Sequence, residues 1–177
     1  MRGDENIFSI LLSRPEIVFS PLSYRPLQYG INYLPTTKKE LEKWTKENCH
    51  NFNGYSINGN AIFEGYGIDN TEGIFTWYFT ERGQIKKLQS FQSENEIIVY
   101  AFNQIKTDKW ARSHCIGFTT SKDEKNELEN ILQERSIEYF QDKIPYYGIE
   151  RPVYRTFIYG CDINKTQQLK EKYYVAL

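Results

Sequence analysis

Residues 74–109 constrain the fold of this chain more than any other segment. They begin with the aromatic run IFTWYF, pass through a polar turn, TERGQ, and end in an apolar-periodic stretch that follows SENE. Aromatic and β-branched residues favour strands. Ser93 and Glu96 form a capping box, in which each side chain accepts a hydrogen bond from the other residue's backbone amide at a helix start. The segment therefore predicts a strand, a turn and a helix. The apolar spacing assigns five residues to the core face of this helix: Ile97, Ile98, Ala101, Phe102 and Ile105.

Two further capping boxes predict two further helices. Thr37 and Glu40 open a helix over about 38–48, with Leu41 and Trp44 on its apolar face. Ser121 and Glu124 open another, which we expect to bury three apolar residues. These residues are Leu128, Ile131 and Leu132.

Strands are expected on either side of these helices. Residues 51–73 are rich in glycine and asparagine, which mark turns, and the apolar residues between them predict two short strands. The alternating, aromatic run PVYRTFIYG at 152–160 predicts a late strand, which we place beside IFTWYF in an antiparallel sheet. In that arrangement Arg155 would pair with Glu81, an interpretation that we prefer to a catalytic arginine.

Together these elements predict the fold class α+β, with a mainly antiparallel sheet and about three helices packed on it. A chain of 177 residues fits a single domain with one core. We therefore assign 1–177 to one domain. Four prolines interrupt residues 1–36, so this stretch is expected to form an arm of short strands packed on the domain.

Composition restricts the partners and the compartment. The net charge of −1 argues against direct binding of nucleic acid, which requires a basic surface. The sequence has no apolar run near the ~18 residues that a membrane span needs, and its first residues do not have the pattern of a secretory signal. We expect a cytoplasmic protein that does not act at a membrane.

The few candidates for catalysis are weak. His114, in WARSHC, lies next to Cys115. Together with Arg112 and Glu81, His114 suggests a small hydrolase or nuclease. Neighbouring residues on a strand point to opposite faces, however, which weakens a Cys115–His114 nucleophile pair. His50 is interpreted as a C-terminal cap of the first helix.

No cofactor or metal is expected. The three cysteines are widely spaced and lack a CxxC pair, so they are interpreted as reduced core residues. The sequence contains neither a phosphate-binding lysine motif nor clustered histidines. We therefore predict no catalytic residues.

Protein binding explains the composition better. Fourteen tyrosines and eleven phenylalanines exceed what a core of this size needs, and tyrosine is enriched at protein interfaces. Residues 60–75 and 121–142 are also acidic, which indicates either solvated surface or a partner-facing patch.

The cassette FTWYFTERGQIKKLQSFQSENEIIVYAFNQIKTDKWARSH, followed by LQERSIEYFQDKIPYYG and PVYRTFIYGCDI, resembles immunity proteins of polymorphic toxin and contact-dependent growth-inhibition systems. The shared pattern is a Tyr/Phe strand ending in ERG, a helix opened by F-x-SE, and a late YRxF strand, over about 74–162. The resemblance implies a non-enzymatic protein that binds the C-terminal domain of a cognate toxin and covers its active site or substrate surface.

If the toxin is a nuclease, its basic groove would face acidic residues, which speeds association. An exposed sheet edge offers a second mode, strand addition. The alternatives are the hydrolase above and a housekeeping adaptor that binds a host protein. The residues expected to contact the toxin are Glu64, Asp69, Glu72, Glu127, Glu134, Glu138, Asp142, Tyr146 and Tyr147.

Overall fold

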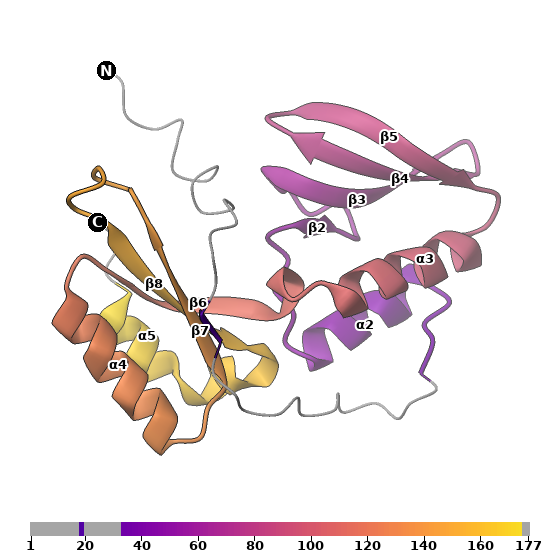
Figure 1. Ribbon diagram of the computed structural model, residues 1–177. Helices are drawn as coiled ribbons and strands as arrows, with labels where there is room; N and C mark the ends of the chain where they lie inside the picture. Colours follow the sequence, from indigo (N-terminus) through magenta and orange to yellow (C-terminus); the bar gives the residue numbers. More distant parts are fainter. Residues whose placement is uncertain (1–17, 20–32, 175–177) are drawn as a thin grey trace. The chain divides into compact units, whose positions relative to one another are not determined.

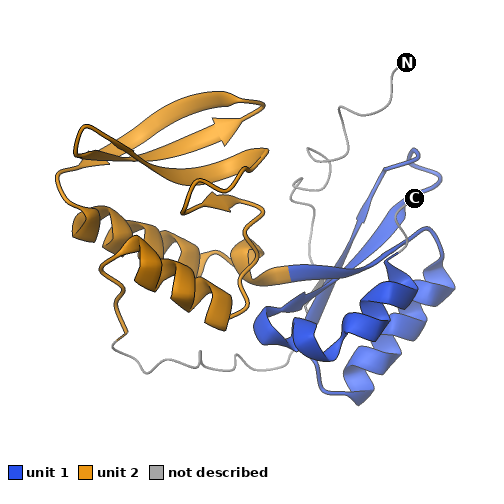
Figure 2. Cartoon of the chain, turned by 180° about the vertical axis from the view of Figure 1, so that it is seen from behind, with its two compact units in different colours: residues 1–25, 114–177 blue, residues 26–113 orange. Residues whose placement is uncertain are grey.

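The computed structural model describes residues 18–19 and 33–174, and it contains two four-stranded sheets with helices (Figure 1). The chain forms two compact units (Figure 2). Unit 1 comprises residues 1–25 and 114–177, and unit 2 comprises residues 26–113. The α+β class is confirmed. Most of the predicted arm at 1–36 lies outside the described residues.

Unit 2 is built on a sheet in the order β2-β3-β4-β5. Its strands are β2 (Tyr55–Ser56), β3 (Glu64–Thr71), β4 (Ile74–Glu81) and β5 (Gln84–Phe91). β2 pairs with β3 in parallel, and the other pairs are antiparallel. The predicted strand IFTWYF is thus confirmed as β4, whereas the sequence patterns do not predict β5.

Two-residue turns join the three long strands of unit 2. Glu72 (φ 53°) and Gly73 (φ 83°) connect β3 to β4, and Arg82 (φ 50°) and Gly83 (φ 78°) connect β4 to β5. Positive φ at both central positions is the geometry of a type I′ turn, whose twist matches that of the flanking strands. The ERG sequence is therefore explained by a tight hairpin turn.

Helices cover one face of this sheet, namely α2 (Lys38–Glu47) and α3 (Glu94–Thr107) (Figure 1). All five residues predicted for the core face of α3 are buried. They pack with Leu41 and Trp44 of α2 and with Trp77 of β4 in one cluster. The predictions of both helices and of their core faces are confirmed. A short 3-10 helix, η1 (Trp110–Arg112), follows α3.

Unit 1 is built on a sheet in the order β1-β7-β8-β6. Its strands are β1 (Val18–Phe19), β6 (Ser113–Thr119), β7 (Tyr139–Ile144) and β8 (Val153–Tyr159). β7 and β8 form an antiparallel hairpin, and β1 pairs with β7. The late strand is confirmed as β8, but its predicted neighbour is wrong. β8 lies beside β7 and β6 because the nearby strand β7, rather than the distant β4, forms its hairpin.

The helices of unit 1 are α4 (Lys122–Glu134) and α5 (Gln167–Tyr173), with a 3-10 helix, η2 (Gly160–Lys165), before α5. Leu128 and Leu132 of α4 are buried, and Ile131 is partly buried beside them. They pack with apolar residues of β6, β7, β8 and α5. The buried residues of unit 2 form one cluster, and those of unit 1 form two. The assignment of the whole chain to one domain stays a prediction.

The capping boxes of α2 and α3 are complete, with both reciprocal hydrogen bonds present. The third is half formed. The Ser121 side chain accepts from the Glu124 amide, but the Glu124 carboxylate accepts from the Thr119 hydroxyl instead of the cap backbone. Thr119 in turn accepts from the Ser121 amide at 3.0 Å. The end of β6 therefore supplies the partner that the capping box would have supplied.

Candidate protein-binding surfaces

The loop between β7 and β8, residues 145–152, presents the most exposed apolar side chains of unit 1. We call it the hairpin tip. Ile149 is 86% exposed and Tyr147 is 47% exposed. Exposed aromatic and aliphatic side chains on a supported loop are the usual anchors of a protein interface.

The hairpin tip is held by its own backbone. The Tyr146 amide donates to the Ile144 carbonyl at 2.9 Å, the Gly148 amide to the Pro145 carbonyl at 3.2 Å, and the Arg151 amide to the Gly148 carbonyl at 3.1 Å. Gly148 has φ 106°, a conformation that favours glycine. Hydrogen bonds within residues 144–151 therefore hold the backbone of the turn without help from a partner.

Aromatic packing ties the hairpin tip to the sheet. The ring of Tyr146 meets Phe118 of β6 edge-on, with centroids 5.5 Å apart, and meets Tyr147 edge-on at 4.9 Å. The guanidinium of Arg151 lies 5.9 Å from the Tyr147 ring centroid. Tyr146 is thus the half-buried support, and Tyr147 is the exposed ring. Of the tyrosine pair predicted to contact a partner, Tyr147 has the surface to do so.

The acidic residues predicted in unit 1 do not form one patch. Glu127 is paired across the helices with Lys172 at 3.0 Å, and that hydrogen bond lowers the pKa of Glu127. Glu134 is exposed at the C-terminal end of α4, and Glu138 is half-buried just before β7. The hairpin tip begins at the other end of β7, and a strand of this length spans roughly 17–20 Å. Glu134 and Glu138 therefore lie near one end of β7, and the aromatic residues of the hairpin tip lie at its other end.

The prediction that Asp142 contacts a partner is wrong, because its side chain is buried and unavailable to a partner. Its carboxylate accepts from Arg155 Nε at 2.7 Å and from Nη2 at 2.6 Å, and both side chains are fully buried. The two residues face each other in the β7–β8 register. The predicted pairing of Arg155 with Glu81 is therefore also wrong, because the cross-strand neighbour within its own hairpin takes that place.

The acidic residues predicted in unit 2 lie on different faces of its sheet. Glu64 and Asp69 are five positions apart on β3, so their side chains leave opposite faces. Glu64 lies opposite Glu81 in the β3–β4 register, and Asp69 accepts from the Thr71 hydroxyl at 2.8 Å. Glu72 occupies the turn. They are surface residues of one hairpin rather than one acidic face.

The residues of the hydrolase alternative belong to different elements. Glu81 is exposed at the end of β4, Arg112 lies in η1, and His114 is half-buried in β6. His50 is not the C-terminal cap of α2. Asn48 is that cap, while His50 is buried with its ring 4.6 Å from the ring of Trp44.

The cysteines also differ from expectation. Cys49 and Cys161 are disulfide-bonded, so the prediction of reduced residues is wrong for both. Cys115 is a free thiol that donates to the Gly117 carbonyl at 3.3 Å, and burial raises its pKa to about 12. A thiol in this state is protonated at neutral pH and does not act as a nucleophile.

Cys115 should therefore react slowly in the native protein. At pH 8 its thiolate fraction is far below that of an unperturbed cysteine, so we expect iodoacetamide to modify it at least about tenfold more slowly in buffer than in urea. Intact-mass spectrometry over time measures both rates without a reductant. Equal rates in the two conditions would contradict the protonated thiol.

The surface that sequence reasoning missed is β5. Residues 84–90 are all exposed, including Ile85 at 66% and Leu88 at 45%. Its sequence does not alternate between apolar and polar residues, so the pattern does not predict a strand. The register of its pairing with β4 shifts between Trp77 and Tyr78. The paired lysines Lys86 and Lys87 between two apolar residues were the available signal.

Comparison with known proteins found no family model, no curated protein and no solved structure that matches this chain. The immunity-protein resemblance therefore stays a prediction. Within residues 18–19 and 33–174, no helix has the length and apolar character to cross a membrane. The same residues contain no group of three or more acidic, histidine or cysteine side chains able to hold a metal ion.

Proposed function

We propose that this chain is a non-enzymatic immunity protein that binds the C-terminal domain of a cognate toxin, which we take to be a nuclease, and covers its active site or substrate surface. It would act in the cytoplasm of the cell that carries it. The observation that carries the proposal is the hairpin tip, where Ile149 and Tyr147 are exposed on a loop fixed by its own hydrogen bonds.

The hairpin tip has the composition of an interface anchor. A preorganised loop loses little conformational freedom on binding, so more of the free energy of burying its side chains contributes to affinity. Tyr147 has an apolar ring and a polar hydroxyl, and Arg151 lies close enough to its face for a cation–π contact. Such a tip fits an apolar pocket with a polar rim.

Acidic residues elsewhere in unit 1 are consistent with a basic partner. Glu134 is an exposed carboxylate at the C-terminal end of α4, where the helix dipole disfavours negative charge, and the last turn of α4 has no basic residue. Its charge is thus not explained by the stability of the helix. A basic nuclease groove would be attracted by such charges, which chiefly raises the association rate.

The test is co-expression with the toxin encoded upstream of this chain, followed by affinity purification. We expect growth rescue and co-purification with the wild-type chain. Ile149→Ala should weaken binding by about 2 kcal/mol, or roughly thirtyfold in dissociation constant, because a central anchor is lost. Titration calorimetry with a catalytically inactive toxin domain measures the change.

Ile74→Ala is the matched control, since Ile74 is another exposed isoleucine, 47% exposed at the start of β4. Its affinity should equal that of the wild type. A wild-type chain that neither rescues growth nor co-purifies would overturn the immunity function. A chain that rescues growth, with equal affinities for the Ile149 and Ile74 variants, would instead remove the hairpin tip from the interface.

A further inference from the structure

β5 forms one edge of the unit 2 sheet. The strand order ends at β5, and within the described residues β5 pairs with β4 alone. A strand has hydrogen-bonding groups on both of its edges, so the outer edge of β5 presents backbone N–H and C=O groups to solvent. Such an edge is a template onto which another strand can add.

The side chains of β5 restrict what can add there. Lys86 and Lys87 contribute two positive charges, the strand contains no acidic residue, and Ile85 and Leu88 are exposed apolar side chains beside them. Lysines and irregular pairing protect edge strands against indiscriminate association. By contrast, the exposed side chains of Ile85 and Leu88 favour association with another strand. Charge selects the partner, and apolar contact contributes affinity.

A second copy of this chain is a poor occupant of that edge. Pairing β5 with β5 would bring four lysines onto one short double strand without a carboxylate on either strand, and like charges on neighbouring strands destabilise pairing. An extended segment with acidic side chains has the complementary charge. It would place carboxylates beside the lysines and apolar groups beside Ile85 and Leu88.

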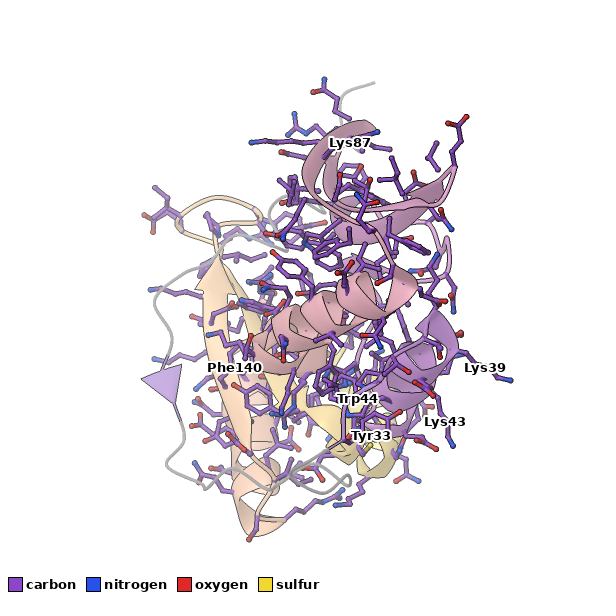
Figure 3. The ribbon with its side chains drawn as sticks, turned by 90° about the vertical axis from the view of Figure 1, so that its right-hand side faces the viewer. Tyr33, Lys39, Lys43, Trp44, Lys87 and Phe140 are labelled. Atoms are coloured by element: carbon purple, nitrogen blue, oxygen red, sulfur yellow. The ribbon has the colours of Figure 1, made fainter. Side chains whose placement is uncertain are left out.

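The edge is preorganised for this role. The β3–β4–β5 meander is closed by two type I′ turns, and β4 packs through Trp77 against the helices. Figure 3 shows Lys87 at the sheet, away from Trp44 among the helices, while Lys39 and Lys43 project from the outer side of α2. Strand addition would therefore require no rearrangement of β5.

We infer that β5 binds an extended, acidic segment of a protein partner, which adds to the sheet as a fifth strand. The segment has carboxylates near Lys86 and Lys87 and apolar side chains near Ile85 and Leu88. This inference does not depend on the identity of the partner bound by the hairpin tip, or on the immunity function.

The experiment selects random peptides displayed on phage against the full-length chain. We expect enrichment of peptides that combine aspartate or glutamate with β-branched residues. A synthetic peptide of the most enriched sequence, measured by fluorescence anisotropy, should bind at least about tenfold more weakly to the Lys86→Glu, Lys87→Glu double variant, because both attractions become repulsions. The matched control is Lys39→Glu with Lys43→Glu, two exposed lysines of the same unit, which should bind as the wild type does.

Hydrogen exchange distinguishes strand addition from binding by charge alone. Peptide binding should slow exchange of backbone amides within residues 84–91, because outward N–H groups gain partners. Equal loss of affinity in both lysine double variants, or no slowing of exchange in β5, would overturn the inference. So would a selection without acidic peptides, or a β5 that binds a single-stranded oligonucleotide through the same lysines instead. Concentration-dependent dimers lost in the Lys86→Glu, Lys87→Glu variant would assign the edge to a second copy.

Discussion

Asp142→Leu should lower the free energy of unfolding by about 3–5 kcal/mol, one of the largest effects expected for a single substitution in this chain. The substitution removes the Asp142 carboxylate from the fully buried Arg155 guanidinium. Arg155→Met should cost a similar amount for the converse reason. The double variant should be more stable than either single variant, because two apolar side chains replace two buried charges in the same space. Urea denaturation followed by far-ultraviolet circular dichroism measures all three.

An exposed ion pair of the same unit provides the control. Lys165 and Asp162 lie 2.7 Å apart near the surface, where water screens the charges. Replacing both by methionine and leucine should change stability by less than about 1 kcal/mol. If Asp142→Leu is no more destabilising than this pair, the buried charges are solvated in solution, and the structural account of the β7–β8 hairpin is wrong.

The second large effect is expected at Gly65. Its φ of +145° is unfavourable for a side chain, and a Cβ there would lie 2.2 Å from the Gly54 carbonyl oxygen. That oxygen already accepts from the Tyr66 amide at 2.9 Å, next to the parallel pairing of β2 with β3. The clash therefore involves backbone that cannot move without losing a hydrogen bond. We expect Gly65→Ala to cost about 3 kcal/mol or more, as strain and overpacking add.

All three tryptophans, Trp44, Trp77 and Trp110, belong to unit 2, so tryptophan fluorescence reports on this unit during urea denaturation. Gly83→Ala is the control. Gly83 has φ +78° but open space around its Cα, so only conformational strain of about 1 kcal/mol applies. Similar losses at the two glycines would mean that the β2–β3 contact yields easily.

Local signals in the sequence predicted the helices well. A capping box and an apolar period are each properties of a few neighbouring residues, so α2 and α3 could be placed with their core residues. The third capping box shows the limit of such local signals, because the Glu124 carboxylate accepts a hydrogen bond from Thr119 of the preceding strand. A pattern specifies which groups can bond, but tertiary neighbours decide which ones do.

Strand pairing and burial of charges were less predictable. β8 was recognised from its own residues, but its neighbour depends on β7, whose mixed sequence YFQDKI hides a strand. Because the sequence does not predict β7, it indicates a surface position for Asp142 instead of a cross-strand pairing with Arg155. Of the residues of the hairpin tip, the sequence pointed to Tyr146 and Tyr147. Ile149 could not be singled out, because exposure of an isoleucine is a property of the folded chain.

The pairing of β1 with β7 has a consequence for synthesis. Val18 and Phe19 pair with Gln141 and Phe140, so one strand of unit 1 leaves the ribosome before all of unit 2 and its partner leaves after it. Unit 2 is continuous in sequence and can fold as soon as it emerges. The N-terminal strand has to wait for β7, and during that interval its backbone is open to chaperones and to neighbouring chains.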